Sequence, residues 1–163
     1  MAKRFPIGIQ DFEKLRKSGF CYVDKTALVY EIANGSQYNF LSRPRRFGKS
    51  LLVSTLKAYF LGKKELFEGL AMADLEKDWT TYPVFHIDFV GRSYNEIKDL
   101  YYRLENLVSE WEDLYGKSEA ELDLHERFKN LIKAAYDKTG KQVVILIDEY
   151  DKPLIDNIDH PEM

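Results

Sequence analysis

The apolar run at residues 143–147 constrains the fold of this chain more than any other feature. It holds five consecutive apolar residues, mostly β-branched, and it follows a helical pattern that ends at Gly140. A strand with one face in water alternates apolar and polar residues, so an unbroken apolar run is typical of a strand buried on both faces. Such strands occur in parallel sheets covered by helices, and we therefore expect an α/β fold.

Helical patterns separate this strand from two others. The clearest helix is predicted at residues 94–115, where apolar side chains recur at steps of three and four. Ser118 and Glu121 have the spacing of a capping box and predict where the following helix begins. In chain order, the elements predicted before the last strand lie at residues 10–17, 24–32, 38–42 (strand), 48–60, 83–90 (strand), 94–115 and 118–140. Strands that alternate with helices predict a mostly parallel sheet in a core at residues 38–163, preceded by a helical preface at residues 1–37.

A phosphate-binding loop is predicted at residues 43–50, between the strand at 38–42 and the helix that follows. The segment has the spacing of the Walker A motif, G-x-x-x-x-G-K-[ST], which requires a strand–loop–helix context. Gly48 lets the backbone approach phosphate oxygens, the Lys49 ammonium reaches the β- and γ-phosphates, and the Ser50 hydroxyl can ligate Mg²⁺. The nucleotide-binding residues predicted from the motif are Arg43, Pro44, Arg45, Arg46, Phe47, Gly48, Lys49, Ser50 and Leu51.

Arg43 departs from the motif, which has glycine at that position. An arginine there makes the turn without strain as long as its φ stays negative. Pro44 removes one backbone donor from the loop, and the Arg45 and Arg46 side chains can compensate by binding phosphate. The alternative interpretation is a basic loop ahead of a helix with a chance Gly-Lys-Ser.

Two carboxylates, Asp148 and Glu149, follow the apolar strand directly. This is the Walker B arrangement, in which the aspartate holds Mg²⁺ and the glutamate orients the attacking water. Ligands of open α/β sheets bind at the carboxyl ends of strands, and the strand at 38–42 is expected to bring its loop to the same edge. Asp88 at the end of another predicted strand, and Asp151 shortly after Glu149, are further candidates. The alternative is a strand that simply ends in acidic residues.

Composition narrows the function classes. The net charge of −3 gives no overall attraction to nucleic acid, so any polyanion contact must be local. The single cysteine, Cys21, cannot form an internal disulfide, which fits a reducing compartment. No apolar stretch approaches the roughly 20 residues of a membrane span, so we expect a cytoplasmic protein without a membrane partner.

Several segments together resemble the AAA-ATPase-like family of bacterial P-loop proteins. They lie at residues 9–12, 22–26, 42–52, 82–89 and 146–153, and the resemblance runs from about Pro6 to Leu154. It implies that arginine is normal at the first loop position, that the ligand is Mg·ATP, and that Lys49 and Glu149 act in hydrolysis. Members are typically longer than this chain, and a PD-(D/E)xK nuclease-like domain often follows.

The resemblance also implies a P-loop NTPase-type three-layer sandwich that is incomplete at its C-terminus. In related ATPases a later strand inserts between the two strands that carry the phosphate loop and the acidic pair. Without that strand, the chain is expected to self-associate through its incomplete sheet or to hydrolyse ATP poorly.

Three functions remain as alternatives from the sequence. The first is an ATP hydrolase whose output depends on other parts of a longer protein. The second is a non-hydrolysing, nucleotide-dependent interaction module that uses the same pocket. The third is the ATPase part of a nucleic-acid-acting protein, which rests only on the nuclease-like domain of relatives.

Overall fold

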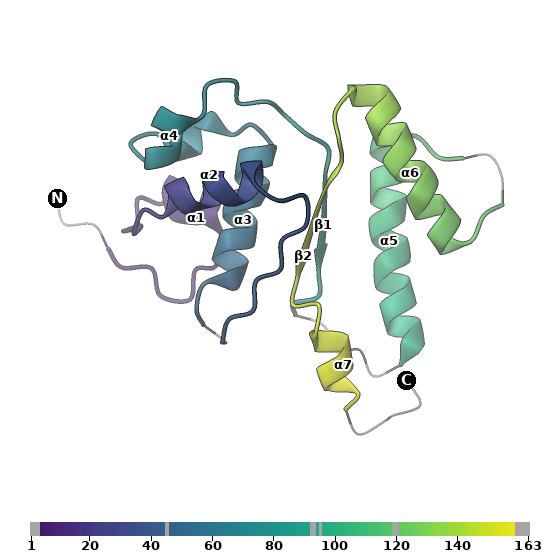
Figure 1. Ribbon diagram of the computed structural model, residues 1–163. Helices are drawn as coiled ribbons and strands as arrows, with labels where there is room; N and C mark the ends of the chain where they lie inside the picture. Colours follow the sequence, from purple (N-terminus) through teal and green to yellow (C-terminus); the bar gives the residue numbers. More distant parts are fainter. Residues whose placement is uncertain (1–3, 45, 92–93, 95, 119–120, 159–163) are drawn as a thin grey trace. The chain divides into compact units, whose positions relative to one another are not determined.

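The structure is a computed structural model that describes residues 4–44, 46–91, 94, 96–118 and 121–158 (Figure 1). The chain forms two compact units, which divide between Thr81 and Tyr82. Unit 1 is helical in its described part, and unit 2 contains both strands and helices. Each unit is described by itself below.

Unit 1 is built from short helices that bury one apolar face each. They are α1 (Phe12–Lys17), α2 (Thr26–Asn34), α3 (Lys49–Phe60), the 3-10 helix η1 (Lys64–Phe67) and α4 (Ala71–Leu75). Phe12 and Phe67 are fully buried at its centre, with ring centroids 5.0 Å apart. The predicted helices at 10–17 and 48–60 are thus confirmed, with small shifts at their ends.

Ser54 of α3 ties the N-terminal segment to the helix that follows the predicted phosphate loop. Its hydroxyl accepts a hydrogen bond from the Phe12 N–H at 3.0 Å and lies 3.1 Å from the Gln10 carbonyl, to which it can donate. Asp11 caps α1 by accepting from the Lys14 N–H at 2.7 Å. The segment at residues 9–12 therefore has a structural role, which is to fix α1 against α3.

The second helix, predicted at residues 24–32, starts two residues later, and the N-cap of α2 is Lys25 and not Asp24. The Asp24 carboxylate instead accepts hydrogen bonds from the Thr26 N–H and hydroxyl at 2.8 and 2.7 Å, and from the Ala71 N–H at 2.7 Å. The Thr26 hydroxyl accepts from the Met72 N–H at 3.0 Å. Burial raises the pKa of Asp24, but these donors outweigh it and the net shift is downward. Asp24 and Thr26 thus hold the start of α4 from a distant part of the chain.

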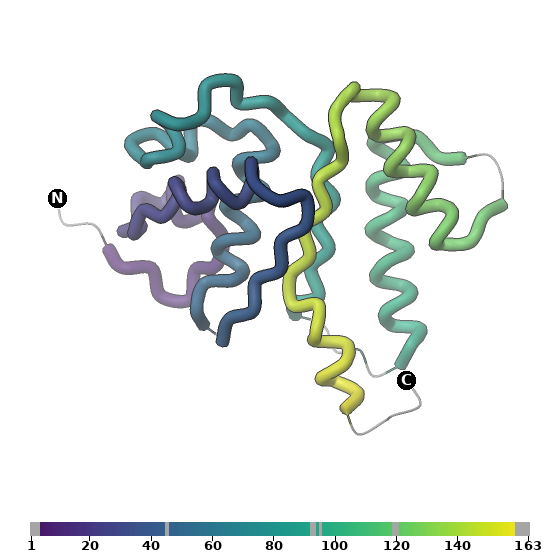
Figure 2. Tube along the Cα trace, in the orientation of Figure 1, coloured from purple at the N-terminus to yellow at the C-terminus, as the bar shows by residue number. Residues whose placement is uncertain are grey.

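Unit 2 is an α/β unit with a parallel sheet, which confirms the predicted fold class. Its elements are β1 (Val84–Asp88), α5 (Ile97–Tyr115), α6 (Leu124–Thr139), β2 (Val144–Asp148) and α7 (Lys152–Asp156). The two strands run side by side in Figure 2 and pair in parallel, with Val84 opposite Val144 and Asp88 opposite Asp148. The helices between the strands supply the long crossover that a parallel pair requires.

The core of unit 2 lies between β1 and the pair of helices α5 and α6. Phe85 is fully buried and stacks on Trp111, with centroids 4.5 Å apart and planes 12° apart. In a parallel pair, residues opposite each other project from the same face, so Ile145 and Ile147 share the face of Phe85. They remain 43% and 48% exposed. The prediction that the strand β2 is buried on both faces is therefore wrong, because α5 and α6 pack mainly against β1.

The strand predicted at residues 38–42 is not formed. The segment has no assigned strand, and its chain can be followed as an extended trace in Figure 2. Tyr38 and Phe40 are 86% and 73% exposed. An apolar run becomes a strand only where a neighbour satisfies its backbone groups, and in the described residues β1 and β2 pair with each other alone.

Both long helices begin later than their apolar patterns predict. Glu96 and Asp99 form a capping box, so α5 starts at Ile97. The helix α6 starts at Leu124 because Asp123 caps it, accepting from the Glu126 N–H at 2.8 Å. The capping box predicted from Ser118 and Glu121 is therefore wrong, since a better-placed aspartate follows them.

Candidate functional site

The predicted phosphate loop leads directly into α3, whose first residue is Lys49. Gly48 is the N-cap and has a φ of +76°, a conformation that favours glycine. Nothing lies within 4 Å of where a Cβ on Gly48 would stand. The start of α3 has neither a side-chain cap nor an acidic residue in its first turn. The first N–H groups of α3 therefore have no side-chain cap, and a helix start of this kind fits an anion such as phosphate.

The Lys49 side chain bends back across the loop. Its Nζ donates a hydrogen bond of 3.0 Å to the carbonyl oxygen of Arg43, six residues earlier. Arg43 is not among the described residues with positive φ, so this arginine makes the turn without strain. Arg46 does have a positive φ, of +67°. The loop thus has left-handed residues at Arg46 and Gly48. Position 43 has no positive φ and therefore does not need a glycine.

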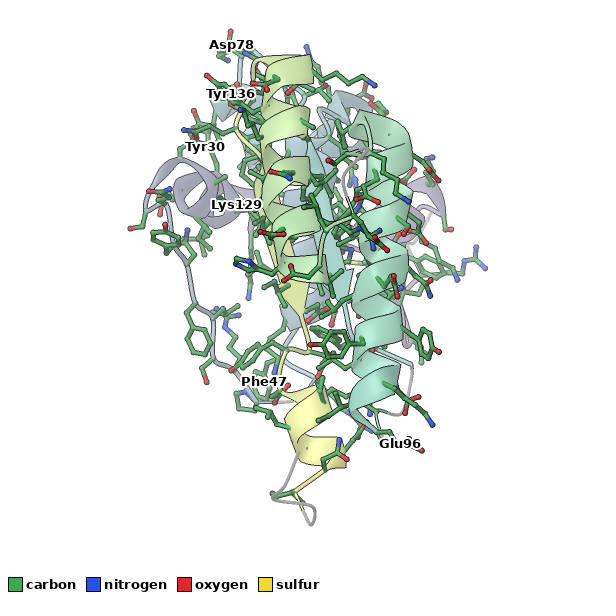
Figure 3. The ribbon with its side chains drawn as sticks, turned by 90° about the vertical axis from the view of Figure 1, so that its right-hand side faces the viewer. Tyr30, Phe47, Asp78, Glu96, Lys129 and Tyr136 are labelled. Atoms are coloured by element: carbon green, nitrogen blue, oxygen red, sulfur yellow. The ribbon has the colours of Figure 1, made fainter. Side chains whose placement is uncertain are left out.

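The other predicted loop residues lie as follows. Pro44, Phe47 and the Arg46 side chain are exposed, and Figure 3 labels Phe47. Ser50 and Leu51 occupy the first turn of α3 and are half-buried. Arg45 lies outside the described residues. Extended chain, and not a strand, precedes the loop, so only the loop–helix part of the expected context is formed.

The acidic candidates gather at the carboxyl end of the sheet in unit 2. Asp88 ends β1 and Asp148 ends β2, and the strand register sets them directly opposite each other. Their side chains project from the same face, since opposite residues of parallel strands share a face. Asp148 is only 6% exposed, and one of its oxygens accepts the Glu149 N–H at 3.0 Å. One Asp88 oxygen accepts the Val90 N–H at 2.7 Å.

Glu149 is held in a left-handed backbone conformation, with φ of +53°. Its N–H is bonded to Asp148, and its carbonyl accepts the Lys152 N–H at 2.9 Å. A non-glycine residue in this region carries a strain of about 1 kcal/mol or more, and such residues cluster at functional sites. The half-buried Glu149 is thus fixed at the point where the sheet ends.

Asp151, the remaining acidic candidate, is the N-cap position of α7 and makes no side-chain capping bond. The segment at 151–153 is therefore the start of a helix, and Pro153 stands within its first two positions. The helix α7 was not predicted from the sequence. A lysine and an aspartate four residues apart, Lys152 and Asp156, were a signal for it.

The acidic edge suits a metal that is shared with a phosphate ligand. Among the described residues, no group of three or more His, Cys, Asp and Glu side chains could enclose a metal ion. The edge instead offers the pair Asp88 and Asp148. Mg²⁺ is usually held by one or two carboxylates together with substrate phosphates, so this donor set fits Mg²⁺ bound with a nucleotide.

Sequence reasoning missed a basic side chain behind this edge. Arg103 of α5 donates to the Asp88 carbonyl from Nε and one terminal nitrogen, at 3.3 and 3.0 Å. It therefore anchors the end of β1 to α5. The helical pattern gave no signal for this contact, because arginine at that position is equally compatible with a solvated face.

The predicted loop belongs to unit 1 and the acidic edge to unit 2. The chain belongs to the AAA-ATPase-like family, because the family model described as Predicted AAA-ATPase matches residues 6–163. The resemblance seen in the sequence is thereby confirmed.

A protein of Azotobacter chroococcum mcd 1, described as an uncharacterized protein in the vnfD 5'region, is 40% identical over 163 residues. The match covers 99% of this chain and 31% of that protein, so the chain spans about a third of its relative. No solved structure matches the chain significantly. In the part of the chain that the structure describes, no helix is both long and apolar enough to cross a bilayer.

Proposed function

We propose that this chain is the Mg·ATP-binding part of an ATPase. The observation that carries the proposal is the start of α3, where left-handed Gly48 and the returning Lys49 side chain frame an uncapped helix N-terminus. Phosphate oxygens would accept hydrogen bonds from the first N–H groups of α3, and the Lys49 ammonium would exchange the Arg43 carbonyl for the β- and γ-phosphates.

The acidic residues of unit 2 have further proposed roles. Ser50 in unit 1 and Asp148 in unit 2 are the residues that would hold Mg²⁺, and the ion would supply positive charge to neutralise the phosphate groups. Glu149 would orient a water molecule in line with the γ-phosphate and take up its proton as the phosphorus–oxygen bond to ADP breaks. Asp88 pairs with Asp148 in the strand register and is a further candidate for holding the metal, and Asp151 is a further candidate for the γ-phosphate.

The proposal extends to the fold of the nucleotide core. The parallel pair β1 and β2, with helices in the crossover, supports a P-loop NTPase-type three-layer sandwich as the complete arrangement. The division into a preface at 1–37 and a core at 38–163 stays a prediction. Self-association through the incomplete sheet and contact with nucleic acid also stay predictions.

Titration calorimetry and phosphate release test the proposal with four variants of this chain. Lys49→Ala is expected to lose ATP affinity at least about tenfold, because the phosphate-binding ammonium is gone. Lys133→Ala, an exposed lysine of α6, is the matched control and should bind like the wild type. Glu149→Gln should bind ATP and lose turnover by about a hundredfold or more, whereas the exposed Glu110→Gln keeps it.

Equal affinity in Lys49→Ala and Lys133→Ala would overturn the phosphate site. ATP binding that depends on Lys49 without any phosphate release above that of Glu149→Gln would favour the non-hydrolysing interaction module. A thermal shift with Mg·ATP against Mg·GTP at equal concentration tests the base, since the nucleotide that binds more tightly stabilises the protein more.

A further inference from the structure

The backbone of Tyr94, in the segment between β1 and α5, makes two hydrogen bonds with residues at the end of α7. Its N–H donates to the Asp156 carboxylate at 3.2 Å, and its carbonyl accepts a hydrogen bond from the Asn157 amide. The Tyr94 side chain is only 1% exposed and packs edge-on against Phe89, with centroids 5.7 Å apart. The Asp156 and Asn157 side chains thus hydrogen-bond the backbone of a residue whose own side chain is buried in unit 2.

The Asp156 and Asn157 side chains each make further hydrogen bonds that fix their positions. The two Asp156 oxygens accept hydrogen bonds from the Lys152 ammonium at 2.8 and 2.7 Å. The ammonium and the Tyr94 N–H lower the pKa of Asp156, which keeps it ionised. Asn157 is 8% exposed and also donates to the Pro153 carbonyl at 2.9 Å. We call the contacts of Asp156 and Asn157 with the Tyr94 peptide the Tyr94 bracket.

A helix as short as α7 depends on such contacts, because five residues do not form a stable helix alone in water. Figure 1 and Figure 3 show α7 at the end of unit 2 where α5 begins, marked by Glu96 in Figure 3. The bracket ties α7 to the backbone of Tyr94 at this end of unit 2. It connects the chain that follows β1 with the chain that follows β2.

The bracket is linked to Glu149 through α7 and the turn that precedes it. The first N–H of α7, that of Lys152, is bonded to the Glu149 carbonyl at 2.9 Å. The left-handed backbone of Glu149 persists only if its surroundings over-determine it. One side of Glu149 is fixed by Asp148 at the end of β2, and the other side is fixed by α7.

We propose that Asn157 and Asp156 are positioning residues for Glu149, because their grip on the Tyr94 peptide fixes the turn that aims its carboxylate. This inference rests on the proposed ATPase function, in which Glu149 orients the attacking water. It adds a specific role for two residues at the end of α7 that touch neither the nucleotide nor the metal.

The test compares Asn157→Ala with Asn130→Ala, in which an exposed asparagine of α6 is removed, in the full chain. We measure ATP affinity, phosphate release and hydrogen–deuterium exchange of residues 148–152. Asn157→Ala should keep the affinity of the control, lose turnover about tenfold or more through misplacement of Glu149, and exchange faster at residues 148–152. In a Glu149→Gln background the same change should have no further effect on turnover, because nothing remains to be positioned.

A loss of turnover that is equally large with and without Glu149 would overturn the proposal, since it would show a general structural effect. So would turnover of Asn157→Ala equal to that of Asn130→Ala. Failure of the proposed function gives a different result, which is ATP binding that does not respond to Lys49→Ala. The exchange measurement is independent of hydrolysis, and unchanged exchange at residues 148–152 in Asn157→Ala would overturn the bracket by itself.

Discussion

The left-handed backbone of Glu149 leads to a prediction about stability whose sign is unusual. At most positions alanine is more stable than glycine, because glycine has more conformational freedom to lose on folding. At Glu149, with φ of +53°, a Cβ is strained and glycine is not. We therefore expect Glu149→Gly to be more stable than Glu149→Ala.

The magnitude follows from two opposing contributions. A left-handed conformation costs a residue with a Cβ about 1–2 kcal/mol. The extra freedom of glycine in the unfolded chain costs about 0.4–1 kcal/mol. The net preference for glycine at position 149 is thus about 1 kcal/mol. Both variants lack the Glu149 carboxylate and keep the backbone hydrogen bonds, so their difference isolates the backbone conformation.

Glu110 in the middle of α5 provides the matched control, because it is exposed and helical. There alanine should exceed glycine by about 1 kcal/mol, so the two positions differ by about 2 kcal/mol in opposite directions. Urea unfolding gives the free energies, and 1 kcal/mol corresponds to a shift in Tm of about 2–4 °C for a chain of this length. Alanine as stable as glycine at position 149 would refute the left-handed assignment.

Two further predictions concern the core of unit 2. Arg127→Met leaves the buried Glu112 carboxylate unpaired, because the guanidinium contacts both its oxygens at 3.0 and 2.8 Å. The expected loss in urea unfolding at pH 7 is about 3–5 kcal/mol. The Arg127 hydrogen bonds lower the pKa of Glu112 below its ordinary 4.5, so the wild-type pair contributes fully above that pH and is lost as pH falls through the lowered pKa. The loss of unfolding free energy in Arg127→Met must therefore become smaller as pH falls through that pKa. A loss that does not change with pH would contradict the pairing of Arg127 with Glu112. Phe85→Ala should cost about 3–5 kcal/mol because the fully buried ring leaves a cavity beside Trp111, whereas Phe5→Ala, at a 79% exposed ring, should stay within about 0.5 kcal/mol.

Local patterns in the sequence were sufficient for elements whose signals are local. The strands β1 and β2 and the helix α3 lie within a residue or two of the predicted ranges, because turn residues bound their apolar runs. The segment at 38–42 also contains apolar residues, namely Tyr38, Phe40 and Leu41, and is not a strand. A strand needs a neighbour to satisfy its backbone, and the sequence of one segment does not contain that information.

The candidate site shows the same division between local and non-local information. Gly48 and Lys49 are predictable from spacing, and the turn at Arg46 and Glu149 is not, because left-handed arginine and glutamate have no sequence signal. The pairing of Asp88 with Asp148 depends on the strand register. The roles of Asp24 and Asn157 depend on partners 47 and 63 residues away, which neither periodicity nor spacing reports.

The parallel register of unit 2 has a consequence for synthesis of the chain on the ribosome. Val84 pairs with Val144, so β1 emerges 60 residues before its partner. At about 5–20 residues per second, β1 waits roughly 3–12 s with its backbone groups unsatisfied. Trp111 of α5, which stacks on Phe85 in the folded unit, is synthesised before β2. We expect α5 to cover the nascent β1 during this interval. Substitutions at the contact between β1 and α5 should therefore lower the soluble yield more than their effect on the stability of the folded protein would indicate.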